Sequence, residues 1–154
     1  MIPLISAATL KRIFADSRII AVVGLSPKAA RPSNQVARYL QQAGYQIIPV
    51  NPGQSEILGE RCYPNLHAVP VQVDVVDIFR RADQVEPIVQ DAVAIGAKVV
   101  WMQEGIIDGQ AARLAEQAGL TVIMDRCMQA DHQWLSGQKP LTLHTLQQGK
   151  APAG

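Results

Sequence analysis

The chain of 154 residues has the length of one ordinary domain and is long enough to bury a substantial core. Apolar residues make up 48% and charged residues 18% of it, a globular composition that excludes a disordered chain. Its formal net charge of +1 at pH 7 argues against broad attraction to DNA, RNA or acidic membranes, which bind strongly basic proteins.

The two cysteines, Cys62 and Cys127, are interpreted as reduced thiols, because a domain of this size does not need a single disulfide. No apolar run approaches the ~20 residues that cross a bilayer. The first ten residues lack the basic and apolar regions of a signal peptide. We therefore expect a soluble cytoplasmic protein.

In chain order, residues 6–16 are predicted to form a helix that Ser6 caps. Five short apolar runs follow, rich in valine and isoleucine: Ile19–Val23, Ile47–Val50, Val73–Ile78, Val99–Met102 and Leu120–Met124. Because most of them lack strict polar alternation, they are typical of strands covered on both faces, as in a parallel sheet between layers of helices.

Three segments between these runs carry apolar residues at helical spacing. We expect Ser33 to cap the first and Asp108 to cap the third. Asp83, with Glu86 three residues later, is an acidic variant of the capping box for the middle helix. The glycines expected to end the three helices are Gly44, Gly96 and Gly119.

Strand–helix alternation of this kind predicts an α/β fold, with a doubly wound, mainly parallel, five-stranded Rossmann-like sheet and helices on both faces. We assign residues 1–136 to this domain. Residues 137–154 mix glutamine, glycine, proline, lysine and alanine with little periodicity, which indicates a peripheral carboxy-terminal segment or tail.

Ligands of open parallel sheets bind beyond the carboxyl ends of the strands, where the strand order reverses. The residues that follow the first four strands are therefore the candidate binding residues: Gly24, Ser26, Lys28, Arg31 and Ser33; Asn51 and Pro52; Phe79, Arg80 and Arg81; Gln103 and Gly105. Gly24 lets backbone approach a ligand, and the helix that begins near Ser33 offers the free N–H groups that bind phosphate. The nearby cations indicate a ligand with more than one phosphate.

The loop after the first strand differs from a dinucleotide-binding loop. Of the glycines in the G-x-G-x-x-G pattern it has only Gly24, and the second strand ends at Val50-Asn51-Pro52, without the carboxylate that binds the ribose of NAD. NAD is therefore disfavoured. NADP stays open, because arginines can bind its additional phosphate.

Six motifs occur in order along residues 10–136: Ala21-Val22-Val23-Gly24-Leu25-Ser26, Arg31-Pro32-Ser33, Val50-Asn51-Pro52, Val76-Asp77-Ile78-Phe79-Arg80-Arg81, Trp101-Met102-Gln103-Glu104-Gly105, and Asp125-Arg126-Cys127-Met128 with His132. Each motif alone is weak. In this order and spacing they resemble the small stand-alone bacterial CoA-binding proteins, whose domain is similar to the amino-terminal domain of the succinyl-CoA synthetase alpha subunit.

The resemblance implies that the loop with Gly24, Ser26, Lys28 and Arg31 holds the phosphates of coenzyme A. It implies that the rest of the crevice is lined by Asn51-Pro52, Phe79-Arg80-Arg81 and Gln103-Gly105. The histidine that the synthetases phosphorylate lies in a further domain, so their ligase chemistry is not implied. We expect a protein that binds CoA or an acyl-CoA as a non-catalytic carrier, sensor or regulatory module, with no metal.

Several side chains admit a second interpretation. Cys127 and His132 could form a nucleophilic pair or half a metal site, but the favoured interpretation is a semi-buried thiol and a histidine that fixes the carboxy-terminal segment by a hydrogen bond. Asp74 and Asp77 are expected to anchor loops through backbone N–H groups. Trp101 either stacks on the ligand or belongs to the core.

Three alternative functions remain at this point. The chain could be an NADP-dependent oxidoreductase or nucleotide-binding subunit, an acyl-CoA-handling enzyme that uses Cys127, or an interaction protein whose crevice is a relic. The expected partner is a small nucleotide ligand, without nucleic acid or membrane. A homodimer or an unidentified protein partner is compatible with the sequence.

Overall fold

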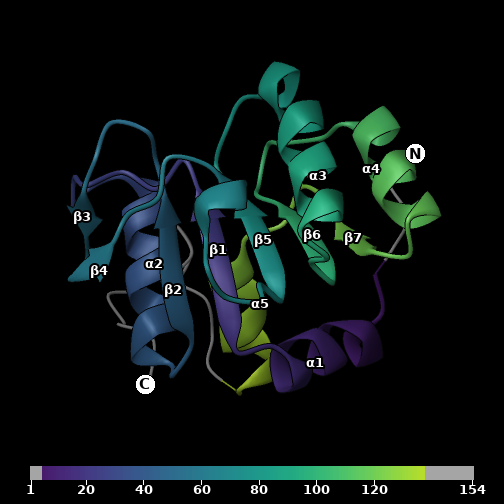
Figure 1. The fold of residues 1–154 in the computed structure, drawn as a ribbon. Helices are drawn as coiled ribbons and strands as arrows, with labels where there is room; N and C mark the ends of the chain where they lie inside the picture. Colours follow the sequence, from purple (N-terminus) through teal and green to yellow (C-terminus); the bar gives the residue numbers. More distant parts are fainter. Residues whose placement is uncertain (1–4, 138–154) are drawn as a thin grey trace.

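The computed structural model describes residues 5–137 and contains the predicted five-stranded parallel sheet (Figure 1). Its strands, in the spatial order β2-β1-β5-β6-β7, are β2 (Gln46–Val50), β1 (Ile19–Val23), β5 (Val75–Ile78), β6 (Val99–Met102) and β7 (Thr121–Ile123). Four of the five predicted runs contain one of these strands, and the fifth, Ile47–Val50, misses only the first residue of β2, Gln46. The predicted tail 137–154 lies, except for its first residue, outside the described residues.

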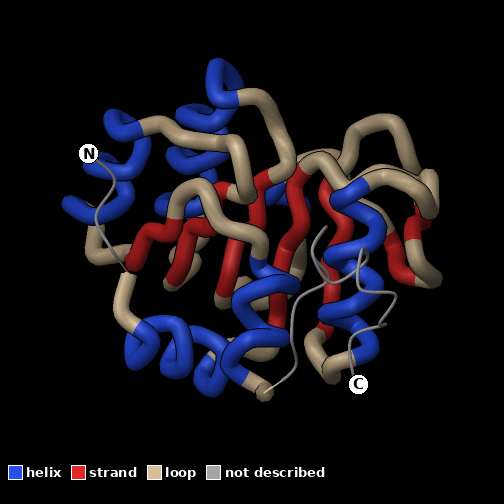
Figure 2. The backbone as a smooth tube through the Cα atoms, turned by 180° about the vertical axis from the view of Figure 1, so that it is seen from behind, coloured by secondary structure: helices blue, strands red, loops and turns tan. Residues whose placement is uncertain are grey.

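Helices cover both faces of the sheet, which confirms the doubly wound α/β fold. On one face lie α3 (Val85–Ala94) and α4 (Gly109–Gln117) (Figure 1). The opposite face, seen from behind in Figure 2, packs against α1 (Ala7–Asp16), α2 (Pro32–Gln42) and α5 (Met128–Leu135). Each layer has its own apolar cluster, so the strands are buried from both sides as their composition predicts.

Two of the four predicted helix caps are confirmed. Ser6 Oγ accepts the N–H of Thr9 at 3.1 Å, and Asp108 Oδ1 accepts two N–H groups at the start of α4. The prediction for Ser33 is wrong, because Pro32 occupies the first position of α2 and places Ser33 inside the first turn.

The predicted capping box is also wrong. Asp83 lies in a 3-10 helix, η2 (Ala82–Gln84), and α3 begins only at Val85. Pro87 explains the shift. It has no N–H to donate, so it fits the first turn of a helix that begins at Val85, where the N–H groups have no partner within the helix. A helix capped by Asp83 would need that missing hydrogen bond.

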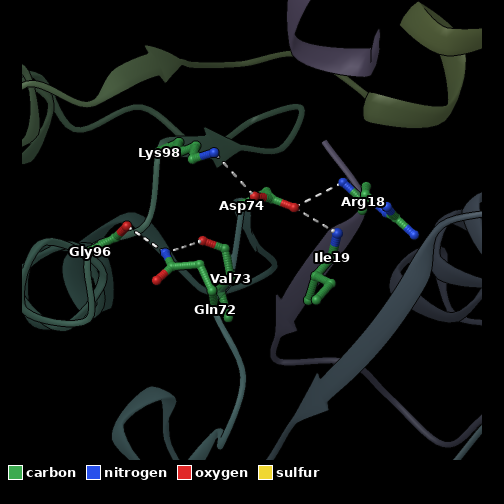
Figure 3. Close-up of polar contacts among 7 residues, drawn as sticks. All are labelled: Arg18, Ile19, Gln72, Val73, Asp74, Gly96 and Lys98. Carbon is green, nitrogen blue, oxygen red and sulfur yellow. Dashed lines mark hydrogen bonds and ion pairs between the residues drawn. The ribbon is translucent and has the colours of Figure 1, made fainter. Parts of the chain in front are cut away.

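The sheet edge at the amino ends of the strands is held by side chains of the segment before β5 (Figure 3). Asp74 Oδ2 accepts the N–H groups of Arg18 and Ile19 at 2.9 and 3.0 Å, and Lys98 Nζ lies 3.7 Å from Asp74 Oδ1. Gln72 Nε2 donates to the carbonyl of Gly96 at 2.8 Å. Asp74 therefore anchors neighbouring backbone, as expected, at the edge away from the predicted crevice.

Several smaller elements were not predicted. They are α5, the two-stranded antiparallel sheet of β3 (Glu56–Ile57) and β4 (Glu60–Arg61), and the 3-10 helix η1 (Leu66–Ala68). The strands of the small sheet are too short for a period-2 pattern, and α5 buries only Met128 and Asp131. Within residues 5–137, no helix is both long and apolar enough to cross a membrane.

The Asp108→Ala substitution should lower the free energy of unfolding by about 1 kcal/mol, because two N–H groups of the first turn of α4 lose their acceptor. Urea denaturation measures the change. Asp83→Ala is the matched control: Asp83 lies 3.5 Å from Arg81 at an exposed position and caps no helix, so its loss should cost less than about 0.5 kcal/mol. Equal losses in the two variants would contradict the assignment of the cap.

Candidate functional site

A pocket of about 640 Å³ lies at the carboxyl ends of β1, β5 and β6. The chain runs outward from β1 to β2 and then returns to β5 on the other side of β1, so β1 and β5 flank the point where the strand order reverses. Nine of the twelve predicted binding residues line this pocket: Gly24, Ser26, Lys28, Arg31, Ser33, Phe79, Arg80, Arg81 and Gln103. The structure thus brings most of the predicted set into one cavity.

The remaining three predicted residues, Asn51, Pro52 and Gly105, lie outside the lining of this pocket. Asn51 Nδ2 donates to the carbonyl of Leu25 at 3.0 Å, so Asn51 supports the first loop. Pro52 lines a smaller cavity of about 200 Å³, which Arg80 shares. Gly105 has a φ of +85° and donates its N–H to Asp125 Oδ1 at 2.7 Å, which indicates a role in the turn.

Gly24 lies where two loops approach most closely. Its φ is +87°, and a Cβ atom at this position would lie 2.3 Å from the carbonyl oxygen of Phe79 and 3.2 Å from Arg80 Nε. Only a residue without a side chain fits there. The close approach brings Arg80 over the loop that follows β1.

The loop between Gly24 and α2 is held by hydrogen bonds to its own polar residues. Ser33 Oγ accepts the N–H of Ser26 at 3.0 Å, and Asn34 Nδ2 donates to the Ser26 carbonyl at 2.9 Å. Ser26 Oγ in turn accepts the N–H of Lys28 at 3.1 Å. Ser33, predicted as a helix cap, therefore fixes the loop instead.

The end of the pocket beside the start of α2 carries positive charge. Helix α2 begins without a side-chain cap, so its first N–H groups and the positive end of its dipole remain available to an anion. Among residues 5–137, no ion pair is found for Lys28, Arg31 or Arg80. Arg81 differs, because it lies at an exposed position 3.5 Å from Asp83.

The other end of the pocket contains Gln103, Glu104, Ile106 and Cys127. The sequence did not place Cys127 near a ligand. After β7 the chain returns toward β6: Arg126 donates its N–H to the Met102 carbonyl at 3.4 Å, and Met128 donates to Gln103 Oε1 at 3.1 Å. These are long-range contacts, and no local pattern around Cys127 reveals them.

Cys127 and His132 have separate surroundings. His132 Nδ1 is hydrogen-bonded to the Tyr39 hydroxyl at 2.6 Å, and its ring packs edge-on against Phe14 and Tyr45. Burial lowers the pKa of His132. This histidine makes a structural hydrogen bond, but the bond joins α5 to α2. The carboxy-terminal segment that His132 was expected to fix lies, from residue 138 on, outside the described residues. No group of three or more His, Cys, Asp or Glu side chains that could hold a metal ion is found within residues 5–137.

Trp101 belongs to the core. Its side chain is fully buried, its indole N–H donates to the Arg126 carbonyl at 2.8 Å, and Phe14 packs against it. The alternative in which Trp101 stacks on a ligand is therefore wrong. The indole supports the pocket from below, because Gln103, two residues further along, lines the pocket on the same face of the sheet.

Asp77 contradicts the expectation that it anchors a loop. It pairs with Val22 on one side and Trp101 on the other, both fully buried, and neither of its carboxylate oxygens has a hydrogen-bond partner among the described residues. Burial raises the pKa of Asp77 well above its usual range. Such surroundings favour the protonated, uncharged form of the acid.

Comparison with known protein families also indicates a CoA-binding domain. The family described as "CoA binding domain" matches residues 18–133. The uncharacterized protein YneT of Bacillus subtilis is 39% identical over 127 residues, which cover 82% of this chain and 94% of YneT. A solved structure of a hypothetical protein from Pyrococcus horikoshii superposes with a TM-score of 0.84 at 38% identity, covering 86% of this chain and 94% of that one.

A larger relative is the ADP-forming acetate–CoA ligase I of Archaeoglobus fulgidus, which is 25% identical over 121 residues. The match covers 72% of this chain but only 18% of the ligase. The shared part is thus a small portion of that enzyme. The family match spans most of the chain, and the chain belongs to the CoA-binding domain family.

Proposed function

We propose that the chain binds coenzyme A or an acyl-CoA in the pocket at the carboxyl ends of β1, β5 and β6, and that it acts as a carrier, sensor or regulatory module without catalysis of its own. One observation supports this most directly. In a CoA-binding domain, the uncapped start of α2 and three cations without an ion pair among residues 5–137 converge on one end of a single pocket.

The arrangement of the pocket matches the two chemical halves of the ligand. Phosphates fit the end formed by the loop after Gly24, where N–H groups, Lys28 and Arg31 supply positive charge. The pantetheine arm is nearly uncharged and fits the apolar side chains of Val36, Phe79 and Ile106. The smaller cavity beyond Arg80 offers room beside the phosphate end.

The absence of catalysis is proposed on the surroundings of the two candidate catalytic groups. The His132 ring is engaged with Tyr39, so it is not available as a base for Cys127. The ligase relative is several times longer than the matched region, so the ligase activity is a property of that longer enzyme. The two free cysteines favour a reducing compartment, for which we propose the cytoplasm.

The Arg31→Ala substitution should weaken CoA binding by roughly tenfold or more, because a charge-assisted hydrogen bond contributes about 1.5–3 kcal/mol. Isothermal titration calorimetry of the reduced protein measures the change. Arg12→Ala removes the same charge from an exposed position of α1, outside the pocket lining, and should leave the affinity unchanged within about twofold.

Unchanged affinity in the Arg31 variant, or an equal loss in both variants, would contradict the proposed position of the phosphates. The same titration with 3′-dephospho-CoA, NAD and NADP in place of CoA tests the ligand class. Binding of NADP together with no binding of CoA would overturn the proposal in favour of an oxidoreductase. Binding of none of the four would favour an interaction protein.

A further inference from the structure

The end of the pocket away from the cations holds a thiol. Cys127 is half-buried there, beside Gln103 and Ile106, while Lys28 and Arg31 line the opposite end. The other cysteine, Cys62, is buried elsewhere in the apolar layer under α2, and its Sγ donates to the Asn51 carbonyl at 3.3 Å. The two thiols are therefore distinguished by position.

The separation of the two ends suits the thiol arm of coenzyme A. The backbone contacts of Arg126 and Met128 place Cys127 over the end of β6, two strands from β1. Two strand spacings amount to roughly 10 Å. The pantetheine arm has about as many chain bonds as four extended residues, so it spans about 14 Å. With its phosphates over the loop after β1, the ligand can bring its sulfur to Cys127.

A second observation concerns the floor at the thiol end. Along the carboxyl ends of the strands, Gly24, Phe79 and Gln103 line the pocket, and on the same face of the sheet the row beneath them is Val22, Asp77 and Trp101. Asp77 thus lies under the floor, on the pocket side of the sheet, and a negative charge on it would raise the pKa of the Cys127 thiol.

Neither carboxylate oxygen of Asp77 has a partner among residues 5–137, although the side chain is fully buried. Proteins leave few buried polar groups unpaired, so Asp77 is an exception that calls for a partner which residues 5–137 do not supply. This observation is independent of the cysteine, and it concerns the same end of the pocket.

We infer that Cys127 forms a mixed disulfide with the thiol of coenzyme A, so that the pocket captures the oxidised form of its ligand. This inference rests on the proposed CoA binding. The Cys127 thiol loses its proton to solvent, and the thiolate attacks one sulfur of CoA disulfide. The disulfide bond breaks, a Cys127–CoA disulfide forms, and the second CoA leaves as a thiolate. The oxidised reactant is CoA disulfide itself, so no further oxidant is required.

The surroundings of Cys127 make this exchange depend on binding. Burial raises the pKa of the thiol, and the N–H groups of Ala130 and Gln129 at the start of α5 oppose the shift. The thiolate is therefore scarce at neutral pH, and disulfides from bulk solution react slowly. A ligand whose other end is held by the phosphate site keeps its sulfur in place, which raises the effective concentration of the disulfide at Cys127.

The test treats the reduced, full-length protein with CoA disulfide and follows its intact mass. The expected product gains one coenzyme A minus one hydrogen from each thiol, and peptide mapping places it on Cys127. Oxidised glutathione, which lacks the nucleotide, should react more slowly by roughly tenfold or more. Cys62→Ser should form the adduct as the natural chain does, and Cys127→Ser should not. Thermal melting of both variants verifies that they fold.

Each other outcome decides against the inference. An adduct on Cys62, or equal rates with CoA disulfide and oxidised glutathione, would show that the pocket does not direct the exchange. If calorimetry shows CoA binding to the reduced protein but no adduct forms, the disulfide inference fails and the proposed function stands. If the reduced protein does not bind CoA at all, both fail.

Discussion

Replacing Gly24 by alanine is expected to lower the free energy of unfolding by about 2–5 kcal/mol and to abolish measurable CoA binding. Two costs combine. A side chain in the left-handed region costs roughly 1–2 kcal/mol, and the added Cβ would lie 2.3 Å from the Phe79 carbonyl oxygen, an overpacking that costs about 1–3 kcal/mol. The backbone fixes the position of Cβ, and its contact is a backbone oxygen, so a side-chain rotation cannot relieve the overlap.

The effect on binding follows from the same contact. The loop after β1 and the segment at Phe79 must separate to admit the methyl group, and both line the pocket. Arg80 Nε lies 3.2 Å from the position of the new Cβ, so its guanidinium must also shift. The phosphate end of the pocket would thus lose its geometry together with its stability.

Gly119→Ala is the matched control for this prediction. Gly119 has a φ of +92°, close to that of Gly24, but no atom lies within 4 Å of a Cβ built there. The control should therefore lose only about 1 kcal/mol, the cost of the backbone conformation, and should bind CoA normally. Urea denaturation and calorimetry of both variants separate the two costs. Equal losses of stability would contradict the steric argument at Gly24.

The sheet and the position of the pocket could be predicted because both depend on local patterns. Runs such as Ile19–Val23 and Val99–Met102 are buried on both faces, and their composition reflects this directly. The place of the pocket follows from a general property of parallel sheets. Gly24 could be recognised as a pocket residue because it directly follows a strand, whereas its close approach to the Phe79 carbonyl is known only from the structure.

The contents of the pocket could be predicted only in part, because some depend on contacts between distant residues. Cys127 reaches the pocket through the bond between Gln103 and the Met128 N–H, which joins residues 25 positions apart. The cap assigned to Ser33 was wrong for a local reason, since Pro32 competes for the start of the helix and the freed hydroxyl accepts the N–H of Ser26. Asp77 interrupts an apolar strand, and nothing in the sequence shows that it lacks a partner.

Replacing Asp77 by asparagine is expected to remove a pH dependence from the stability of the fold. The folded-state pKa of Asp77 is raised, whereas the unfolded chain has the ordinary value of about 3.9. Below that value both states hold the proton. As the pH rises above it, the unfolded state releases the proton first, so the free energy of unfolding falls by up to about 1.4 kcal/mol per pH unit until the folded-state pKa is reached.

The Asp77→Asn variant keeps the shape of the side chain and has no proton to release, so this slope should be absent. Urea denaturation between pH 4 and 8 should show the natural chain losing stability relative to the variant as the pH rises, with the variant the more stable at the upper end.

Asp74→Asn is the control, and its expected change in stability has the opposite sign. The Asp74 carboxylate accepts the N–H groups of Arg18 and Ile19, so weakening it should cost about 1 kcal/mol. A parallel pH slope in the natural chain and Asp77→Asn would mean that Asp77 is charged in the folded protein, and that a partner must satisfy it.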